Sequence, residues 1–504
     1  MNPRPLLTAV LWCSTSLLAA CFNTEANDAA QEARPNVILI SIDTLRADRL
    51  GTYGYERNTT PNIDEFAKQA VVFETAYAQS SWTLASHASM FTGLDPVANG
   101  VTTSKRGRLV DRHVTLAEIL KDEGYTTAAW VGRGEYSFVG AARGLAQGFD
   151  KFEHAPHGQA NPGQSETTAN KPQTKQEKKS SLGEGEAEIT SVLEWLSGQP
   201  KLPFFLFVHL DDVHSQPTGH PYDSPPPFRD RFCPGEIEGY TGCDASGKFC
   251  ATKMLQRIRR GDIPAPSKDE AAKIECLYDG GVAFTDHQVG RLLRSLRELQ
   301  LLDNSVLIVT ADHGEAFLEH GDTLHFSVYE EVARVPLVIR FPGAVHAGRS
   351  AAIVELVDLV PTILAQTGSP VPAFMQGQNL LDVIASPSTL TRVNDTAFTM
   401  GTSDPPPLLW RHGPSKIIVR PKDRTEVEAR YPAEELFDLS SDPGEQRNRV
   451  QEDAELGRQL RQGLERHQHE SAATFKKLRH DPAGDDFEVP EDERELLKAL
   501  GYIE

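Results

Sequence analysis

Acidic and histidine residues follow three strongly apolar runs of the chain, and these residue types can bind metal ions. They are Asp43 after the run 36–42, Asp212 and His214 after 204–210, and Asp312 and His313 after 305–311. The runs are typical of buried strands, and ligands of open α/β sheets bind beyond the carboxyl ends of the strands. A lone Asp in such a place more often caps the next helix. Three strands that end this way favour a divalent-metal site.

The elements that must position these residues follow an alternating pattern. A fourth apolar run covers 335–341, and amphipathic helical segments lie at 63–70, 116–123, 189–196 and 283–299. This alternation predicts an α/β fold with a mainly parallel sheet flanked by helices. Residues 155–187 are polar without periodicity and are expected to form a mobile surface insertion. A change of pattern near residue 390, to short strands and a charged helix near 443–470, divides the chain into a catalytic domain, 35–385, and a smaller C-terminal α+β subdomain, 386–504.

Composition excludes several classes of protein. The chain has 504 residues, of which 39 % are hydrophobic, so it can build a large core and is not globally disordered. Lys and Arg number 51 and Asp and Glu 71, which gives a net charge of −20. This charge repels phosphate backbones, so we expect no nucleic-acid partner.

The N-terminus is typical of an export signal. Arg4 precedes an apolar run that ends in Leu18-Ala-Ala-Cys21, a pattern similar to the bacterial lipobox. We therefore expect a signal peptide at 1–20, a tether at 21–34, and a lipid anchor at the outer membrane or the periplasmic face. Ordinary cleavage after Ala20 without a lipid is the alternative. No other segment is long and apolar enough to span a bilayer.

Four cysteines cluster near the middle of the chain, at Cys233, Cys243, Cys250 and Cys276. In an exported protein they predict two disulfides, and three pairings are open. A zinc site is the rival interpretation, but no C-x-x-C pair is present. We expect disulfides that brace a loop at 215–275.

Short motifs run in order along the chain from residue 34. They are Arg34–Asp48, Thr60–Asp64, Trp82–Gly93, Thr310–Glu315, Tyr329–Leu337, Val357–Leu364 and Glu435–Leu439. Together they resemble the sulfatase family of the alkaline phosphatase superfamily. The resemblance leaves 215–275 uncovered. It implies that family's fold and a metal-dependent ester hydrolase.

The position of the family's nucleophile differs from the usual pattern. Family sulfatases carry a Cys or Ser that is oxidised to formylglycine, and the resemblance places Thr83 there, with Ala85 and His87 where Pro and Arg are usual. We expect no formylglycine and an ordinary hydroxyl nucleophile activated by metal. A sulfated threonine cannot collapse to an aldehyde, whereas a phosphothreonine can be attacked in line. Thr83 therefore favours phosphate esters; the alternative is a helix-capping threonine.

The resemblance also implies the remaining site residues. The metal ligands would be Asp43, Thr83, Asp312 and His313, and an imidazole in place of an amide favours Zn or Mn over Ca or Mg. His214 and His325 would be catalytic. His325 stands where formylglycine sulfatases usually have lysine, and a histidine at this position is similar to the lipid-A phosphoethanolamine transferases. Substrate contacts would come from His87, Lys105, Arg106 and Asp212. The alternative for His325 is a surface or core histidine that is hydrogen-bonded but has no role in catalysis. The alternative for Lys105 and Arg106 is a solvated basic turn.

These observations lead to one hypothesis and three alternatives. We expect an exported hydrolase that cleaves phosphate mono- or diesters of a small molecule or an envelope polysaccharide. The alternatives are a sulfuric ester hydrolase with unmodified Thr83, a phosphoethanolamine- or phosphoglycerol-type transferase, and an inactive anion-binding lipoprotein. The sequence leaves open the alcohol, the number of metals and the oligomeric state.

Overall fold

The computed structural model describes residues 34–102, 107–132, 137–154, 183–215, 220–235, 251–385 and 395–478. The expected signal peptide, nearly all of the tether, Lys105, Arg106, Cys243, Cys250 and most of the insertion 155–187 lie outside these ranges. Predictions about them therefore stay predictions.

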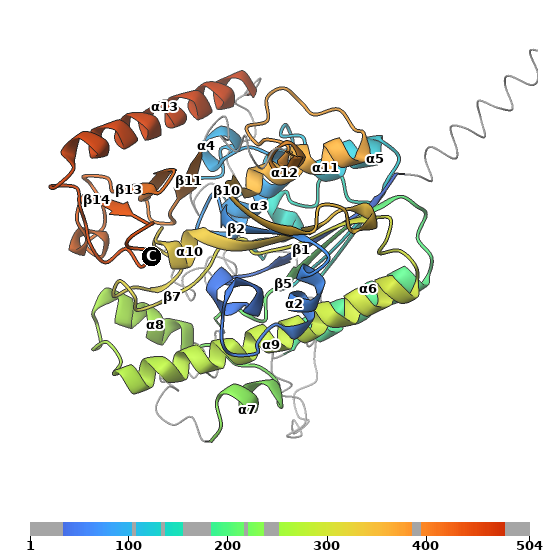
Figure 1. Ribbon diagram of the computed structural model, residues 1–504, viewed down its shortest axis with the longest axis horizontal. Helices are drawn as coiled ribbons and strands as arrows, with labels where there is room; N and C mark the ends of the chain where they lie inside the picture. Colours follow the sequence, from blue (N-terminus) through green and yellow to red (C-terminus); the bar gives the residue numbers. More distant parts are fainter. Residues whose placement is uncertain are drawn as a thin grey trace, which may run out of the picture.

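An eight-stranded sheet forms the centre of the molecule, in the order β10-β2-β9-β6-β1-β5-β3-β4 (Figure 1). Its strands are β1 (Asn36–Ile42), β2 (Val71–Tyr77), β3 (Thr126–Val131), β4 (Lys151–His154), β5 (Phe204–Leu210), β6 (Ser305–Thr310), β9 (Arg334–Arg340) and β10 (Gly348–Glu355). All neighbours pair in parallel except β9, which is antiparallel to both β2 and β6. The predicted mainly parallel sheet is confirmed, and all four predicted strands belong to it.

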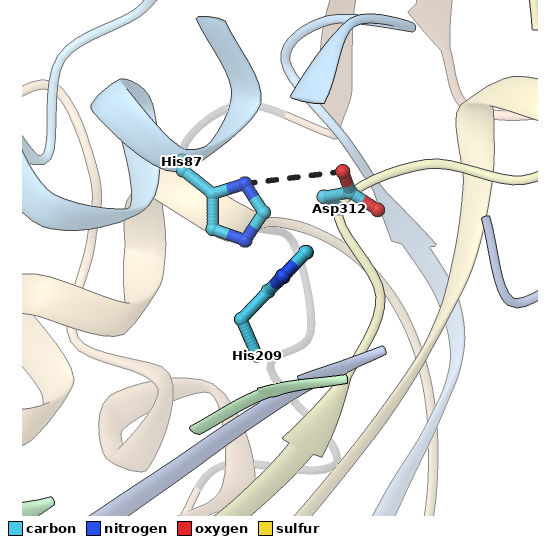
Figure 2. A group of neighbouring side chains, drawn as sticks. All are labelled: His87, His209 and Asp312. Carbon is cyan, nitrogen blue, oxygen red and sulfur yellow. Dashed lines mark ion pairs between the residues drawn. The ribbon is translucent and has the colours of Figure 1, made fainter. Parts of the chain in front are cut away.

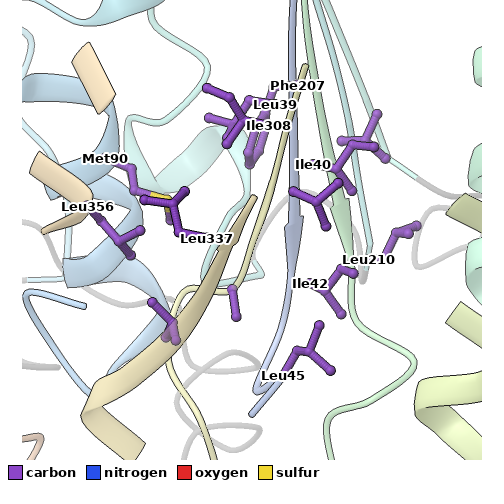
Figure 3. Close-up of a cluster of buried hydrophobic side chains, with 14 of the residues drawn as sticks. Leu39, Ile40, Ile42, Leu45, Met90, Phe207, Leu210, Ile308, Leu337 and Leu356 are labelled. Carbon is purple, nitrogen blue, oxygen red and sulfur yellow. The ribbon is translucent and has the colours of Figure 1, made fainter. Parts of the chain in front are cut away.

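Helices cover both faces of this sheet (Figure 1). One face carries α2 (Pro61–Ala67), α6 (Glu184–Ser197) and α9 (Lys268–Glu298), and the other carries α3 (Thr83–Thr92), α5 (Leu116–Asp122), α11 (Leu359–Thr367) and α12 (Leu380–Ala385). The strands in the middle are buried on both sides because their side chains are apolar in both directions. Figure 3 shows this core, in which Leu39, Phe207 and Ile308 of three adjacent strands gather together.

The C-terminal part forms its own antiparallel sheet, as the change of pattern near residue 390 predicted. Its strands are β11 (Thr396–Met400), β12 (Leu408–His412), β13 (Ser415–Val419) and β14 (Glu434–Asp438), and α13 (Ala454–Leu478) packs against them. Polar contacts join this subdomain to helical segments that flank the large sheet, α10 (Glu330–Ala333) and α4 (Pro96–Asn99). Lys416 Nζ lies 3.0 Å from Glu330 Oε1, and Asp95 Oδ2 lies 2.9 Å from His467 Nε2 of α13.

A disulfide links Cys233 to Cys276. It joins the end of α7 (Phe228–Phe232) to α9, so the cysteine-containing loop is covalently attached to the helix that covers the sheet. Among the helices in the described ranges, none combines the length and apolarity needed to cross a membrane.

Candidate active site

The central strands β6, β1 and β5 carry polar side chains at their carboxyl ends. Ser41 of β1 pairs with His209 of β5 on one side and with Thr310 of β6 on the other. Asp43 directly follows β1, and Asp312 follows β6 by one intervening residue. These neighbouring strand ends bring together residues that are far apart in the sequence.

Asp43, Asp312 and His313 form a buried group of potential ligands. One donor atom of each lies within 4.8 Å of the others. His313 Nε2 is 3.3 Å from Asp312 Oδ2 and 4.0 Å from Asp43 Oδ1. The arrangement of two carboxylates and one imidazole fits a divalent cation.

Thr83 lies at the first position of α3 and faces this group. Its side chain is buried, and its Oγ1 is 3.2 Å from His313 Nε2. The hydroxyl of Ser86, one turn further along α3, donates to the backbone carbonyl of Asp312 at 2.7 Å. The helix start and the metal loop are therefore held together, and the positive end of the helix dipole lies at the site.

Burial sets the charge state of the ligand group. It raises the pKa of Asp312 to about 7, even though the backbone amides of Thr44 and His313 donate to Oδ1 at 3.2 and 2.9 Å. Burial, with His325 nearby, lowers the pKa of His313 to about 4. The imidazole is therefore neutral near pH 7, and its lone pair is compatible with metal binding. The carboxylate is costly to keep charged in the interior, and a bound cation would offset that cost.

His87 and His209 lie beside the ligand group, and with Asp312 they form a second set of potential donors (Figure 2). His87 Nδ1 is 2.7 Å from the carbonyl oxygen of Thr83, and Nε2 is 3.0 Å from Ser41 Oγ. Burial holds the pKa of His87 well below its usual value, so the ring is neutral. Both ring nitrogens are thus in contact with the protein, and the substrate contact predicted for His87 would require one of them to be displaced.

His325 lies next to His313, and His214 lies next to His325. The ring of His325 is 4.4 Å from that of His313 and 5.3 Å from that of His214. Both side chains are buried, at 1 % and 3 % exposure for His325 and His214. The structure therefore brings the two histidines that the sequence predicted as catalytic to the same place as the predicted ligands.

The family model that describes sulfatases matches residues 35–369 of this chain. The chain belongs to the sulfatase family. The match covers the large sheet, all of the ligand group and Thr83, so the family and the fold predicted from the sequence are confirmed. A sulfatase of this kind is an ester hydrolase.

Relatives and solved structures agree with this assignment. The sulfatase is 26 % identical to an arylsulfatase of Clostridium perfringens over 83 % of this chain and 90 % of that protein. It is 25 % identical to an N-acetylgalactosamine-6-O-sulfatase of Bacteroides thetaiotaomicron, over 92 % and 98 %. Its fold is similar to that of a phosphonate monoester hydrolase of Agrobacterium radiobacter, with a TM-score of 0.63, 22 % identity, and coverage of 88 % and 96 %.

Asp212 has a different position from the other predicted residues of the sulfatase site. Its Oδ2 accepts a hydrogen bond of 2.9 Å from the amide of Gly185 in the first turn of α6. Burial, followed by the charge of Asp211, raises the pKa of Asp212 to about 8. The carboxyl group thus accepts a hydrogen bond at the start of a helix. This is the role that a lone Asp after a strand more often has.

Several residues of the sulfatase site were missed by the sequence reasoning. His209 interrupts the apolar run 204–210, and this single polar residue in a buried strand was a usable signal. Glu315 is fully buried and has its Oε1 3.4 Å from His325 Nδ1. Thr44 has a left-handed backbone, with φ of 58°. The hydroxyl of Tyr278 donates to the carbonyl of Thr44 at 2.7 Å and accepts from the amide of Arg46 at 2.9 Å. We call this pair of hydrogen bonds the Tyr278 clamp, and no local sequence pattern predicts it.

Proposed function

We propose that this sulfatase-family enzyme hydrolyses phosphate mono- or diesters through the unmodified hydroxyl of Thr83. The observation that carries the proposal is the position of Thr83 Oγ1, at the start of α3 and 3.2 Å from His313 Nε2. The Cβ of threonine carries a methyl group, so oxidation of its hydroxyl would give a ketone rather than the aldehyde of formylglycine. The hydroxyl itself is then the nucleophile.

Asp43, Asp312, His313 and Thr83 would hold a divalent ion in this proposal. Carboxylates combined with an imidazole favour Zn or Mn over Ca or Mg. Such an ion supplies Lewis acidity, which lowers the pKa of the Thr83 hydroxyl and offsets charge on the ester. The match to the sulfatase family and the buried ligand group support this assignment.

The residues around Thr83 have complementary roles in the reaction. Thr83 Oγ1 attacks phosphorus, and the amides at the start of α3 stabilise negative charge on the phosphoryl oxygens. The ring of His325 lies beside that of His313, and the ring of His214 lies beside that of His325. In this proposal, the two histidines stabilise or protonate the departing alkoxide. Water then cleaves the phosphothreonine ester and restores Thr83. A sulfate ester of threonine would also need direct attack of water, because the aldehyde-forming route by which formylglycine releases sulfate is closed to it.

Sulfate ester hydrolysis by the same hydroxyl is the second candidate. It is favoured by the relatives, which include an arylsulfatase and an N-acetylgalactosamine-6-O-sulfatase. The proposal also places the enzyme outside the cytoplasm, anchored by a lipid on Cys21. The Cys233–Cys276 disulfide supports export, because such bonds persist in oxidising compartments.

The test compares three substrates that share one leaving group: 4-nitrophenyl phosphate, bis(4-nitrophenyl) phosphate and 4-nitrophenyl sulfate. The metal content of the same purified sample is measured by elemental analysis. We expect zinc or manganese, and turnover of a phosphate substrate faster than of the sulfate. Calcium together with turnover of the sulfate alone would refute the phosphate proposal and favour the second candidate.

Thr83→Val and Thr83→Ser test the nucleophile. Valine keeps the shape of threonine without its hydroxyl, so we expect kcat/KM to fall at least about 10³-fold. Serine retains the hydroxyl and should keep measurable turnover. Thr92→Val, at the other end of α3, is the matched control because the Thr92 hydroxyl only donates to the Ala88 carbonyl. A fully active Thr83→Val enzyme would contradict the proposal.

A further inference from the structure

Helix α8 (Ala251–Arg260) contacts both of the segments that carry the predicted catalytic histidines. Its Thr252 Oγ1 is 3.2 Å from Oγ of Ser215, which directly follows the first of these histidines in the chain. The hydroxyl of Thr323, two residues before the second histidine, donates to the carbonyl of Leu255 at 2.8 Å. In the proposed function the two histidines face the departing alcohol, so α8 borders the side of the site on which that alcohol lies.

The inner face of α8 is fixed against the protein. The helix packs against β8 (Thr323–Leu324), near the label of β7 in Figure 1. Arg259 Nε lies 2.9 Å from Asp322 Oδ1, and its Nη2 lies 3.0 Å from Glu428 Oε1. The same guanidinium group lies over the ring of Phe326, 4.2 Å from its centre. The buried apolar side chains of the helix are Met254, Leu255 and Ile258.

The outer face of α8 is basic. The helix contains four basic residues and no acidic one, although the whole chain has a net charge of −20. Lys253, Arg257 and Arg260 are spaced by four and three residues, so they lie on one face, along about 10 Å of the helix. We call these three residues the basic stripe. Arg257 and Arg260 are exposed, and neither forms an ion pair with an acidic residue in the described part of the chain.

We propose that the basic stripe determines substrate specificity by binding further anionic groups on the alcohol that carries the ester. The proposal deepens the proposed function and rests on it. An alcohol that extends from Thr83 past the catalytic histidines reaches the Thr252 end of α8 first, and a longer alcohol continues along the stripe. Guanidinium groups bind carboxylate and phosphate groups through two parallel hydrogen bonds. The preferred alcohol is therefore an extended one with more than one negative charge.

The burial pattern of α8 favours a substrate over a membrane as the partner of the basic stripe. A helix that binds at a membrane surface presents apolar side chains to the lipid. The apolar side chains of α8 are instead buried inside the protein, and only charged groups are left on its outer face. The helix also lies in the stretch 215–275, which the motifs of the sulfatase family leave uncovered, as expected of an element that selects the substrate.

The test measures how polygalacturonate, a polymer of carboxylates without phosphate or sulfate esters, inhibits turnover of 4-nitrophenyl phosphate. Dextran is the matched uncharged polymer. We expect polygalacturonate to compete with the ester in the wild type, and its Ki to rise about tenfold in Arg257→Gln/Arg260→Gln. Because salt screens exposed charges, inhibition of the wild type should also weaken as NaCl is added. An unchanged Ki in the double variant, or equal inhibition by dextran, would overturn the proposal.

Arg294→Gln/Arg297→Gln is the matched control. Both arginines are exposed and lie near the end of α9 that leads to the first residue of β6, at the opposite end of the sheet from the candidate site. This double variant removes the same charge from another helix. We expect its Ki for polygalacturonate to equal that of the wild type. An equal rise in this control would show that inhibition follows net charge alone, and would count against the proposal.

Direct binding separates this proposal from the proposed function. Calorimetry of polygalacturonate binding needs no turnover, so a loss of affinity in Arg257→Gln/Arg260→Gln supports the basic stripe even if the ester is a sulfate or Thr83→Val is active. Equal affinity of the variant and the wild type would overturn the stripe even if Thr83 is the nucleophile. Vesicles of phosphatidylglycerol and phosphatidylcholine are compared in the same way. Vesicle binding that is lost in the variant, with polygalacturonate binding unchanged, would identify a membrane-binding face and overturn the proposal.

Discussion

The clamp formed by Tyr278 leads to a prediction about metal affinity. Its hydroxyl bridges the carbonyl of Thr44 and the amide of Arg46, on either side of the turn that follows Asp43. Thr44 is β-branched and has a φ of 58°, a conformation that costs about 1–3 kcal/mol unless the surroundings impose it. Tyr278→Phe removes the hydroxyl and leaves the ring in place.

The expected magnitude follows from the two hydrogen bonds. Each contributes about 1 kcal/mol, and leaving the buried partners unsatisfied adds to the loss, so the free energy of unfolding should fall by about 2–4 kcal/mol. This is the same size as the strain at Thr44. The turn can then relax, which moves Asp43 away from Asp312 and His313. A shift of about 1.4 kcal/mol in this equilibrium raises the Kd for metal about tenfold.

The assay titrates the metal-stripped enzyme with Zn²⁺ or Mn²⁺ by calorimetry and measures unfolding in urea on the same samples. Tyr55→Phe is the matched control. The Tyr55 hydroxyl donates to Asp279 Oδ2 at 2.7 Å in the same region, but it does not touch the turn after Asp43. We expect its Kd for metal to equal that of the wild type.

Two results would refute this reasoning. One is a Tyr278→Phe enzyme that loses stability but binds metal with unchanged affinity, which would make the clamp a purely structural contact. The other is an equal loss of affinity in Tyr55→Phe, which would show that the effect spreads through α9 and not through the turn.

Two further predictions concern stability. Burial raises the pKa of Asp212 and Glu315 to about 8 and that of Asp312 to about 7, so these three groups bind more protons in the folded enzyme than in the unfolded chain between about pH 4 and pH 8. Stability from these groups is therefore lost as the pH rises, and calorimetry of the metal-stripped enzyme should give a lower Tm at the upper end of this window, with a smaller drop in Asp212→Asn; a Tm that rises instead would contradict it. Replacing Cys233 and Cys276 by serine opens a loop with a sequence separation of 43, which the chain-entropy relation values at about 4 kcal/mol. Urea unfolding should show a loss of about 2–4 kcal/mol, and a reducing agent should then destabilise the wild type more than the double variant.

The sequence predicted four strands that are buried on both faces; it missed β3, which is also buried but has few large aliphatic residues, and the strands that have exposed residues. β1, β5, β6 and β9 are continuous apolar runs, because helices cover both of their sides. β2 has partly exposed polar residues in its middle, and β10 begins with an exposed, polar half. Their weaker patterns are typical of strands near a sheet edge. The antiparallel direction of β9 depends on the path of the connection before it, which no local pattern encodes.

The candidate site was predictable to the extent that it follows from strand ends. Asp43, Asp312 and His313 come directly after central strands, so parallel pairing alone brings them together. Asp212 meets the same condition, yet its carboxyl group accepts a hydrogen bond from the neighbouring start of α6 instead. Tyr278 is separated from Thr44 by 234 positions, and their contact depends on how α9 packs against the sheet.

Helix α9 constrains how this protein can change in length. It carries Cys276, which binds the cysteine-containing loop, Tyr278, which holds the metal turn, and Asp286, which anchors α2. Inserting or deleting one residue between Cys276 and Asp286 would rotate one anchor relative to the others by about 100° and shift it by about 1.5 Å. Evolution and protein engineering can therefore exchange side chains on the solvent face of this helix, but insertions and deletions must be confined to segments outside it.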